Sequence, residues 1–368
     1  MRRRKNLRVR RQKSSPRRMP ARSGSGWVGR RSSCRRLSNG FRAPAGAAVW
    51  SVRIVGRHRV HAMPTRRLAI AFAVIAAGLA RAADSAPSLP PPPDRAWVKK
   101  LFDGWRAPVP PQHLLANIYY VGASGVSSFL LTTPEGHFLL DTGFADTVPI
   151  IQKSVEQLGF NLADIKLIIS SHAHIDHVGG HALMKTLTGA RVLASGADAR
   201  TLESGGAEDY IQWPKDTIIY APVKVDRIVA DGERVTLGGV TLTAHLTPGH
   251  TRGATTWTMD ATADGKVQHV VFFSSASIND GTRLVNNPLF PDLVDQFEAT
   301  FAKLKALPCD IFFAPHGGQF AMAEKFAGLE RGEKSNPFVD PAGWRRLIAG
   351  AEKAFRDQWQ REQTAAAK

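Results

Sequence analysis

The sequence predicts an α+β fold in which two β-sheets pack together and helices cover their outer faces. Two observations carry this prediction. Runs of strand-like residues are followed by segments with helical spacing, and this order occurs twice between residues 113 and 368. The chain is also 43% hydrophobic and 22% charged, which is ordinary for a globular protein. Because no run reaches 18 apolar residues, we expect no stable membrane anchor.

The first half opens with three short strands that are expected to pair antiparallel, since Pro134-Glu135-Gly136 supplies a turn between two of them. A helix is expected over residues 146–158, where apolar residues recur at helical spacing. The short apolar run 165–171 is typical of a buried strand. The other expected elements are strands 117–122, 127–133, 137–143 and 191–194, and helices 179–188 and 196–204.

The second half contains two pairs of strands and two long helices. Gly238-Gly239 is typical of a tight turn, here joining strands 234–237 and 240–245. The remaining expected elements are a strand pair at 255–259 and 269–273, a helix over 291–306, a strand at 310–314 and a C-terminal helix over 342–363.

The N-terminal region differs in charge from the rest of the chain. Residues 1–83 contain 22 of the 49 Lys and Arg residues and no Asp or Glu. The remainder has 27 basic and 31 acidic residues, a net charge of −4. The formal charge of +18 therefore describes a leader, and the composition of the remainder gives no reason to expect nucleic-acid binding.

Residues 63–82 have the three parts of an export signal. Arg66 and Arg67 form its positive start, Leu68 to Ala80 is an apolar run, and Ala80-Arg81-Ala82 is a small-residue cleavage site. We expect cleavage before Ala83 and a periplasmic product. The expected organisation is a basic, disordered or untranslated extension at 1–62, the signal at 63–82, a Pro-rich arm at 83–112 and the folded domain at 113–368.

A cluster of potential metal ligands follows the strand at 165–171. His172, His174, Asp176 and His177 lie within six residues. His172 and His174 are two apart, so an extended backbone directs both to one side, whereas Asp176 and His177 follow a turn and can face another way. This arrangement can serve two metal ions.

Two further histidines occupy similar places in the chain. His250 follows the Pro248-Gly249 turn after one strand, and His316 follows the strand at 310–314. Each alone is an ordinary loop histidine, but with the first cluster they supply the missing ligands. His181 is interpreted as a helix-start residue or as a partner of a ligand. In the expected folded domain, the histidines that lack supporting neighbours are His113, His137, His245 and His269.

The pattern His-x-His-x-Asp-His at 172–177, followed by Pro-Gly-His at 248–250 and the late His316, resembles the metallo-β-lactamase superfamily. The resemblance runs from about Ile118 to the C-terminus and includes the run 139–143, which in this family packs beneath the metal loop. It implies a four-layer αββα sandwich with metals in a cleft at one edge of the two sheets.

Within that superfamily the chain is similar to class B β-lactamases of the third subclass. Thioesterases, lactonases and ribonucleases of the superfamily commonly bridge two zincs with an aspartate, and Ser275 stands in that place here. The first subclass has Cys there, and the second also replaces the first histidine, whereas His172, Asp176 and His177 are intact. Family members often carry a disulfide in the C-terminal half. Cys309 departs from that pattern, because the other cysteine, Cys34, would be removed with the leader.

The resemblance implies two Zn²⁺ ions per chain, the first held by His172, His174 and His250 and the second by Asp176, His177 and His316. The expected reaction is hydrolysis of the amide bond of penicillins, cephalosporins and carbapenems by a zinc-bound hydroxide. Asp176 and Tyr220 are the candidate catalytic residues. Ser275 and Ser277 are candidates for binding the β-lactam carboxylate, with sheet packing as the alternative, and Tyr220 for a hydrogen bond near the reacting carbonyl.

Two other functions compete with this one. Another hydrolase on the same scaffold, a lactonase or a thioesterase of the glyoxalase II type, is disfavoured by the serine at position 275. A nucleic-acid-binding protein would need the basic leader in its working form, which the export signal contradicts. The expected partner is therefore a small β-lactam and not a nucleic acid, and the oligomeric state is left open.

Overall fold

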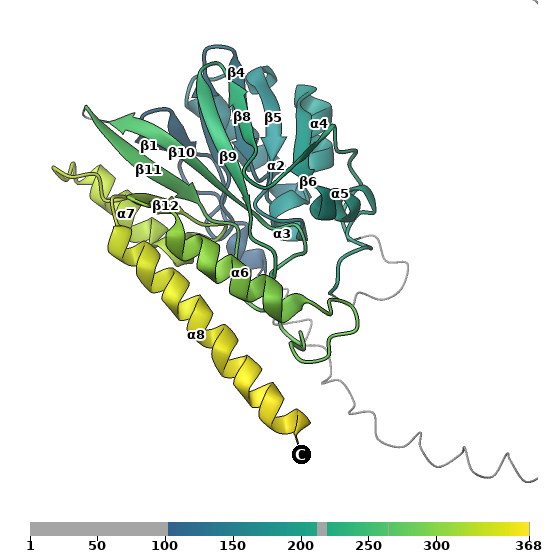
Figure 1. Ribbon diagram of the computed structural model, residues 1–368. Helices are drawn as coiled ribbons and strands as arrows, with labels where there is room; N and C mark the ends of the chain where they lie inside the picture. Colours follow the sequence, from purple (N-terminus) through teal and green to yellow (C-terminus); the bar gives the residue numbers. More distant parts are fainter. Residues whose placement is uncertain (1–101, 212–218, 264, 368) are drawn as a thin grey trace, which may run out of the picture. The chain divides into compact units, whose positions relative to one another are not determined.

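The computed structural model describes residues 102–211, 219–263 and 265–367, which belong to the compact unit Arg81–Lys368 (Figure 1). The predicted extension at 1–62, the export signal at 63–82 and the arm up to residue 101 lie outside the described residues. Within the described ranges, no helix combines the length and the apolar character that a membrane crossing requires.

The first sheet has seven strands among the described residues, and they follow one another in chain order. Strands β1 to β4 pair antiparallel, and β4 to β7 pair parallel. Their bounds are β1 Gln112–Leu115, β2 Ile118–Tyr120, β3 Phe129–Thr133, β4 Gly136–Leu140, β5 Ile165–Ile169, β6 Arg191–Ser195 and β7 Arg227–Val229.

The second sheet has five described strands in the order β12-β11-β10-β9-β8, antiparallel except for the β11–β12 pair. Gly238 and Gly239 connect β8 to β9 with φ of 51° and 84°, the two positive values that a two-residue type I′ hairpin needs. The strands are β8 Arg234–Leu237, β9 Val240–Leu246, β10 Thr255–Ala263, β11 Lys266–Phe272 and β12 Ile311–Phe313.

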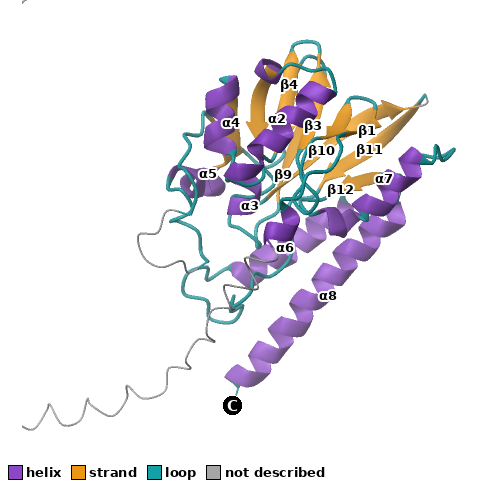
Figure 2. Cartoon of the chain, turned by 180° about the vertical axis from the view of Figure 1, so that it is seen from behind, coloured by secondary structure: helices purple, strands orange, loops and turns teal. Residues whose placement is uncertain are grey.

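Helices cover the outer face of each sheet (Figures 1 and 2). On the side of the first sheet lie α2 Val148–Gln157, α3 Ile175–Val178, α4 His181–Thr188 and α5 Gly196–Glu203. On the side of the second sheet lie α6 Leu293–Ala306, α7 Met322–Glu330 and the long C-terminal α8 Pro341–Ala366. The molecule is thus a four-layer αββα sandwich, and the prediction of an α+β fold is confirmed.

The strands alternate between two hydrophobic cores, as expected for a sheet buried on both faces. In β3, Phe129 and Leu131 face the second sheet, whereas Leu130 between them joins the core under the helices. The Phe129 ring lies 5.4 Å from that of Phe272 and 5.1 Å from that of Phe313, centroid to centroid. These aromatic contacts hold the two sheets face to face.

Among the described strands and α-helices, four were not expected from the sequence: β1, the four-residue helix α3, the edge strand β7 and α7. Several expected strands end earlier than predicted. The run predicted as a strand at 137–143 stops at Leu140, because Asp141 adopts a left-handed conformation with φ of 58°. The strand β11 ends at Phe272, so Ser275 and Ser277 lie in the loop that follows it.

Candidate metal centre

Ligand-bearing loops from both sheets meet at one edge of the sandwich. The strand β5 leads into the loop that carries His172 and His174, and α3 then presents Asp176 and His177. His250 follows β9, and His316 follows β12. The predicted ligands are therefore brought together from three segments that are far apart in the chain.

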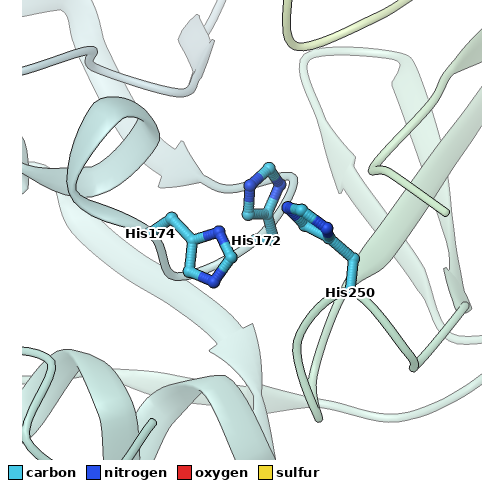
Figure 3. A group of neighbouring side chains, drawn as sticks. All are labelled: His172, His174 and His250. Atoms are coloured by element: carbon cyan, nitrogen blue, oxygen red, sulfur yellow. The ribbon is translucent and has the colours of Figure 1, made fainter. Parts of the chain in front are cut away.

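His172, His174 and His250 form the first group (Figure 3). One ring nitrogen from each residue lies within 4.8 Å of the others. Their ring centroids are 4.8 Å apart for His172 and His174, 4.5 Å for His172 and His250, and 4.7 Å for His174 and His250. This spacing lets three imidazoles converge on one ion.

Asp176, His177 and His316 form the second group, again with one potential ligand atom from each within 4.8 Å of the others. Asp176 Oδ2 lies 3.0 Å from His177 Nε2 and 3.6 Å from His316 Nε2. The two groups adjoin, because the ring centroids of His172 and His177 are only 4.2 Å apart.

Hydrogen bonds orient the histidine rings. Nδ1 of His250 donates to the carbonyl oxygen of Ser277 at 2.8 Å, and Nδ1 of His316 donates to that of Gly125 at 3.1 Å. A carbonyl can only accept, so these contacts fix the tautomer and leave each Nε2 with a free lone pair. Nε2 of His172 is buried without a hydrogen-bond partner, as expected of a metal ligand.

Asp141 supports both groups from beneath. Its Oδ1 accepts the backbone N–H of Ser171 at 2.7 Å, and its Oδ2 accepts the Ser171 hydroxyl at 2.6 Å. The same Oδ2 lies 3.4 Å from Nδ1 of His177, while the Ser171 hydroxyl is 3.1 Å from Nδ1 of His172. The backbone turn at Asp141 thus places its carboxylate against one ligand, His177, and against Ser171, which contacts another ligand, His172.

The charges of the site suit divalent cations. Burial and the neighbouring histidines hold the pKa of His172 and of His250 well below the usual range, so both rings offer neutral lone pairs. Burial opposes ionisation of Asp176, but His177 and His316 outweigh it and lower the pKa of that carboxyl. Burial also opposes protonation of His177, but Asp176 and Asp141 raise its pKa, so these two carboxylates favour positive charge at this position.

Five imidazoles and one carboxylate, with buried unpartnered nitrogens, form a donor set that zinc prefers. The described residues therefore fit metal ions in two adjoining positions.

The predicted substrate residues lie close to the first group but differ in exposure and in hydrogen-bond partners. Ser275 is buried and its hydroxyl is 3.2 Å from that of the exposed Ser277, which in turn lies 3.2 Å from Nδ1 of His250. The hydroxyl of Tyr220 is buried and donates to the carbonyl oxygen of Ala173 at 2.9 Å, with that of Thr201 at 3.2 Å. Tyr220 thus supports the metal loop through its backbone.

A cavity of about 150 Å³ opens beside His174 and Asp176. Apolar side chains, including Ile175, Ile211 and Ile219, make up much of its wall. It offers space for an uncharged group next to the ligands.

Sequence reasoning missed several supporting residues. Asp209 Oδ2 lies 3.2 Å from Nε2 of His174, and the hydroxyl of Tyr210 donates to the carbonyl oxygens of Gly249 and His250 at 2.9 and 3.1 Å. Asn279 Nδ2 also donates to the His250 carbonyl oxygen at 2.7 Å. No local pattern in the sequence marks these residues, because each meets the ligands only through the fold.

Asp198 is a buried acid below the first group. Its Oδ2 accepts the Thr251 hydroxyl at 3.2 Å, whereas Oδ1 has no hydrogen-bond partner. Burial raises the pKa of this carboxyl to about 7, although the Thr251 hydrogen bond opposes the rise.

The other histidines are not part of the two groups. His181 is buried at the start of α4, where Nδ1 lies 2.8 Å from the Thr142 hydroxyl. The rings of His113, His245 and His269 contact Ala116, Thr258 and Asp260 respectively, and His137 accepts from the backbone of Thr133.

Comparison with solved structures finds close likenesses. A metallo-beta-lactamase of Cronobacter sakazakii, described with a HARLDQ motif, is 42% identical; the match covers 72% of this chain and 99% of that chain, with a TM-score of 0.68. BJP-1, a subclass B3 metallo-beta-lactamase of Bradyrhizobium japonicum, is 38% identical; the match covers 72% of this chain and 98% of that one, with a TM-score of 0.67.

A curated relative carries the name of a different enzyme. The hydroxyacylglutathione hydrolase of Rhodospirillum rubrum is 26% identical over 169 residues, which is 44% of this chain. The match spans only 51% of that relative's length.

The family model of the metallo-beta-lactamase superfamily matches residues 121–316, a segment that includes both ligand groups. The predicted resemblance is confirmed by this match and by the structural neighbours. The chain belongs to the metallo-beta-lactamase superfamily.

Proposed function

We propose that this protein is a zinc-dependent β-lactamase that hydrolyses the cyclic amide of penicillins, cephalosporins and carbapenems. The observation that carries the proposal is the composition of the ligand set. Both groups are complete with five histidines and Asp176, and the loop after β11 presents Ser275 instead of a carboxylate. The likeness to a subclass B3 enzyme over nearly all of that enzyme's length supports the same conclusion.

The residues would hold two zinc ions, one in each group. Bound zinc lowers the pKa of a coordinated water to about 7 and polarises a carbonyl oxygen. In the net reaction, water oxygen forms a bond to the carbonyl carbon, the C–N bond breaks, and the ring nitrogen takes up a proton.

The protein's own residues prepare this reaction in three ways. The neutral rings of His172 and His250 bring no negative charge to the first group, so an ion held there would keep its full charge to polarise a substrate carbonyl. Asp176 stays ionised and can accept a hydrogen bond from the attacking water. We assign to the Ser277 hydroxyl, which is exposed and lies 3.2 Å from Nδ1 of His250, a hydrogen bond to the carboxylate of a β-lactam.

Tyr220 acts in this proposal by holding the metal loop at Ala173, because its hydroxyl hydrogen is used by a backbone carbonyl. Burial, with Asp198 and Asp209 nearby, raises the pKa of this phenol, so it stays protonated at neutral pH.

Turnover of three substrates by the purified protein tests the proposal. We expect hydrolysis of a carbapenem, loss of this activity on treatment with a chelator, and recovery when zinc is restored. A lactone and a glutathione thioester serve as competing substrates. Chelator-sensitive turnover of the thioester without any turnover of the carbapenem would reverse the assignment.

The thioesterase is the second candidate, since the Rhodospirillum rubrum relative is a hydroxyacylglutathione hydrolase. Its low identity and half-length match make it the weaker candidate.

We also propose that the segment Met63–Ala82 directs export to the periplasm. N-terminal sequencing of the exported protein should find Ala83 at the start, whereas a start within residues 1–62 would contradict the proposal.

A further inference from the structure

Each ligand group contains one histidine that faces a carboxylate outside the group. In the second group this is His177, whose Nδ1 lies 3.4 Å from Asp141. In the first group it is His174, whose Nε2 lies 3.2 Å from Oδ2 of Asp209. The other two rings of the first group, His172 and His250, face a hydroxyl and a carbonyl oxygen instead.

Asp209 is a buried carboxylate with a defined place. The side chains of His174 and Asp209 are only 12% and 5% exposed, so water screens their interaction little. Asp209 Oδ1 accepts the backbone N–H of Ile211 at 3.3 Å, which leaves Oδ2 directed at His174. The segment is anchored from the other side, because the guanidinium of Arg252 donates to the carbonyl oxygen of Glu208 at 3.3 Å.

We propose that Asp209 is the positioning residue of the first metal group. With metal bound, Asp209 Oδ2 would accept a hydrogen bond from Nε2–H of His174. This fixes the tautomer with a free lone pair on Nδ1, the nitrogen that faces His172 and His250 (Figure 3). The atoms are within reach but not yet aligned as a hydrogen bond, so a small rotation of the ring completes the contact. This inference rests on the proposed metal binding, but not on the identity of the substrate.

The negative charge of Asp209 has a second effect. The first group has no acidic ligand, so a divalent ion there keeps its full charge within a buried site. A carboxylate that contacts a ligand, without being one itself, offsets part of that charge. It also makes the His174 ring a stronger electron-pair donor to the metal. Asp209 thereby compensates part of the positive charge of an ion in the first group. In the second group, Asp176 does so directly as a ligand.

The variant Asp209→Asn separates this role from simple space filling. An asparagine whose oxygen accepts from Ile211 presents its NH₂ group to His174. Nε2 must then be the acceptor, and the proton moves to Nδ1, where it blocks metal binding. The variant therefore keeps the shape of the site while favouring the wrong tautomer.

Zinc titration of the full chain against a chromophoric chelator measures this effect. We expect Asp209→Asn to weaken one of the two zinc sites by about 10- to 100-fold, the usual effect of removing a partner of a metal-bound histidine. Glu208→Gln is the matched control, since its exposed carboxylate lies next in sequence and pairs with Arg200 at 3.8 Å. The control should bind zinc like the wild type. The proposal would be overturned if zinc affinity fell equally in both variants, or if it fell in neither.

A second measurement needs no variant. Long-range ¹⁵N–¹H spectra of the zinc-loaded wild type should show His174 protonated at Nε2 and metal-bound at Nδ1. A His174 ring protonated at Nδ1 would refute the role of Asp209 even if Asp209→Asn failed to fold. Neither readout depends on β-lactam hydrolysis, so failure of the substrate assignment would leave both results interpretable.

Discussion

The buried acid Asp198 makes stability depend on pH in a direction opposite to that of most acidic residues. Its carboxyl has a pKa of about 7 in the folded chain against an ordinary value of 3.8. The folded state therefore binds the proton more tightly than the unfolded state. Below about pH 4 the carboxyl of Asp198 is protonated in both states and does not change the unfolding free energy. As pH rises from 4 toward 7, this group lowers the unfolding free energy progressively.

The magnitude follows from the size of the shift. About three pKa units at 1.36 kcal/mol each correspond to about 4 kcal/mol of unfolding free energy lost between pH 4 and pH 8. Asp198→Asn carries no charge at any pH and escapes this loss. The difference in unfolding free energy, variant minus wild type, should therefore rise by about 4 kcal/mol over that range.

The difference is measured by urea unfolding of the two proteins across this pH range. A chelator is present so that metal binding does not contribute to their stability. Asp226→Asn is a control of opposite sign, because Lys185 and the backbone of Val192 outweigh burial and lower the pKa of Asp226. Its contribution to stability is present at neutral pH and is lost as pH falls through the acid range. A difference between Asp198→Asn and wild type that stays flat from pH 4 to 8 would refute the reasoning.

Three further changes probe the site and its supports. His250→Ala removes one of three ligands from the first group, so we expect most activity and one equivalent of zinc to be lost, measured by kcat/KM and metal analysis; full activity would contradict the assignment. Tyr210→Phe loses the hydroxyl that donates to the His250 loop and should lower unfolding free energy by about 1 kcal/mol in urea titrations. Gly253→Ala places a Cβ 2.2 Å from the Ser195 hydroxyl and 2.4 Å from the Asp198 backbone nitrogen, so a loss of about 1–3 kcal/mol is expected by thermal unfolding; an unchanged midpoint would show that the loop relaxes freely.

The local patterns of the sequence predicted most of the fold. Alternation and apolar runs located the long strands, and helical spacing located α2, α6 and α8. The strand β7 has only three residues, two of them exposed, and so carries no apolar run to recognise. The helix α3 was not predicted, because its four residues overlap the ligand motif, whose histidines suggested a loop.

The ligands could be predicted for the same local reason, whereas their supports could not. His172 to His177 are neighbours in sequence, and His250 and His316 each follow a recognisable strand. Asp209 and Asn279 contact His174 and His250 only after distant segments fold together. The burial of the Tyr220 hydroxyl against Ala173 likewise depends on tertiary packing, which no spacing in the sequence reveals.

The two ligand groups join the halves of the sandwich. Each group combines residues that follow the first sheet's β5 with one histidine from the second sheet, His250 in one case and His316 in the other. An ion bound to either group would therefore link the loops of the first sheet to those of the second. Because binding to the folded chain alone stabilises it, by about 2.7 kcal/mol at a concentration 100 times Kd, the supply of zinc would help to set how much folded protein persists. Scarcity of the metal would then reduce the lifetime of the protein as well as its activity.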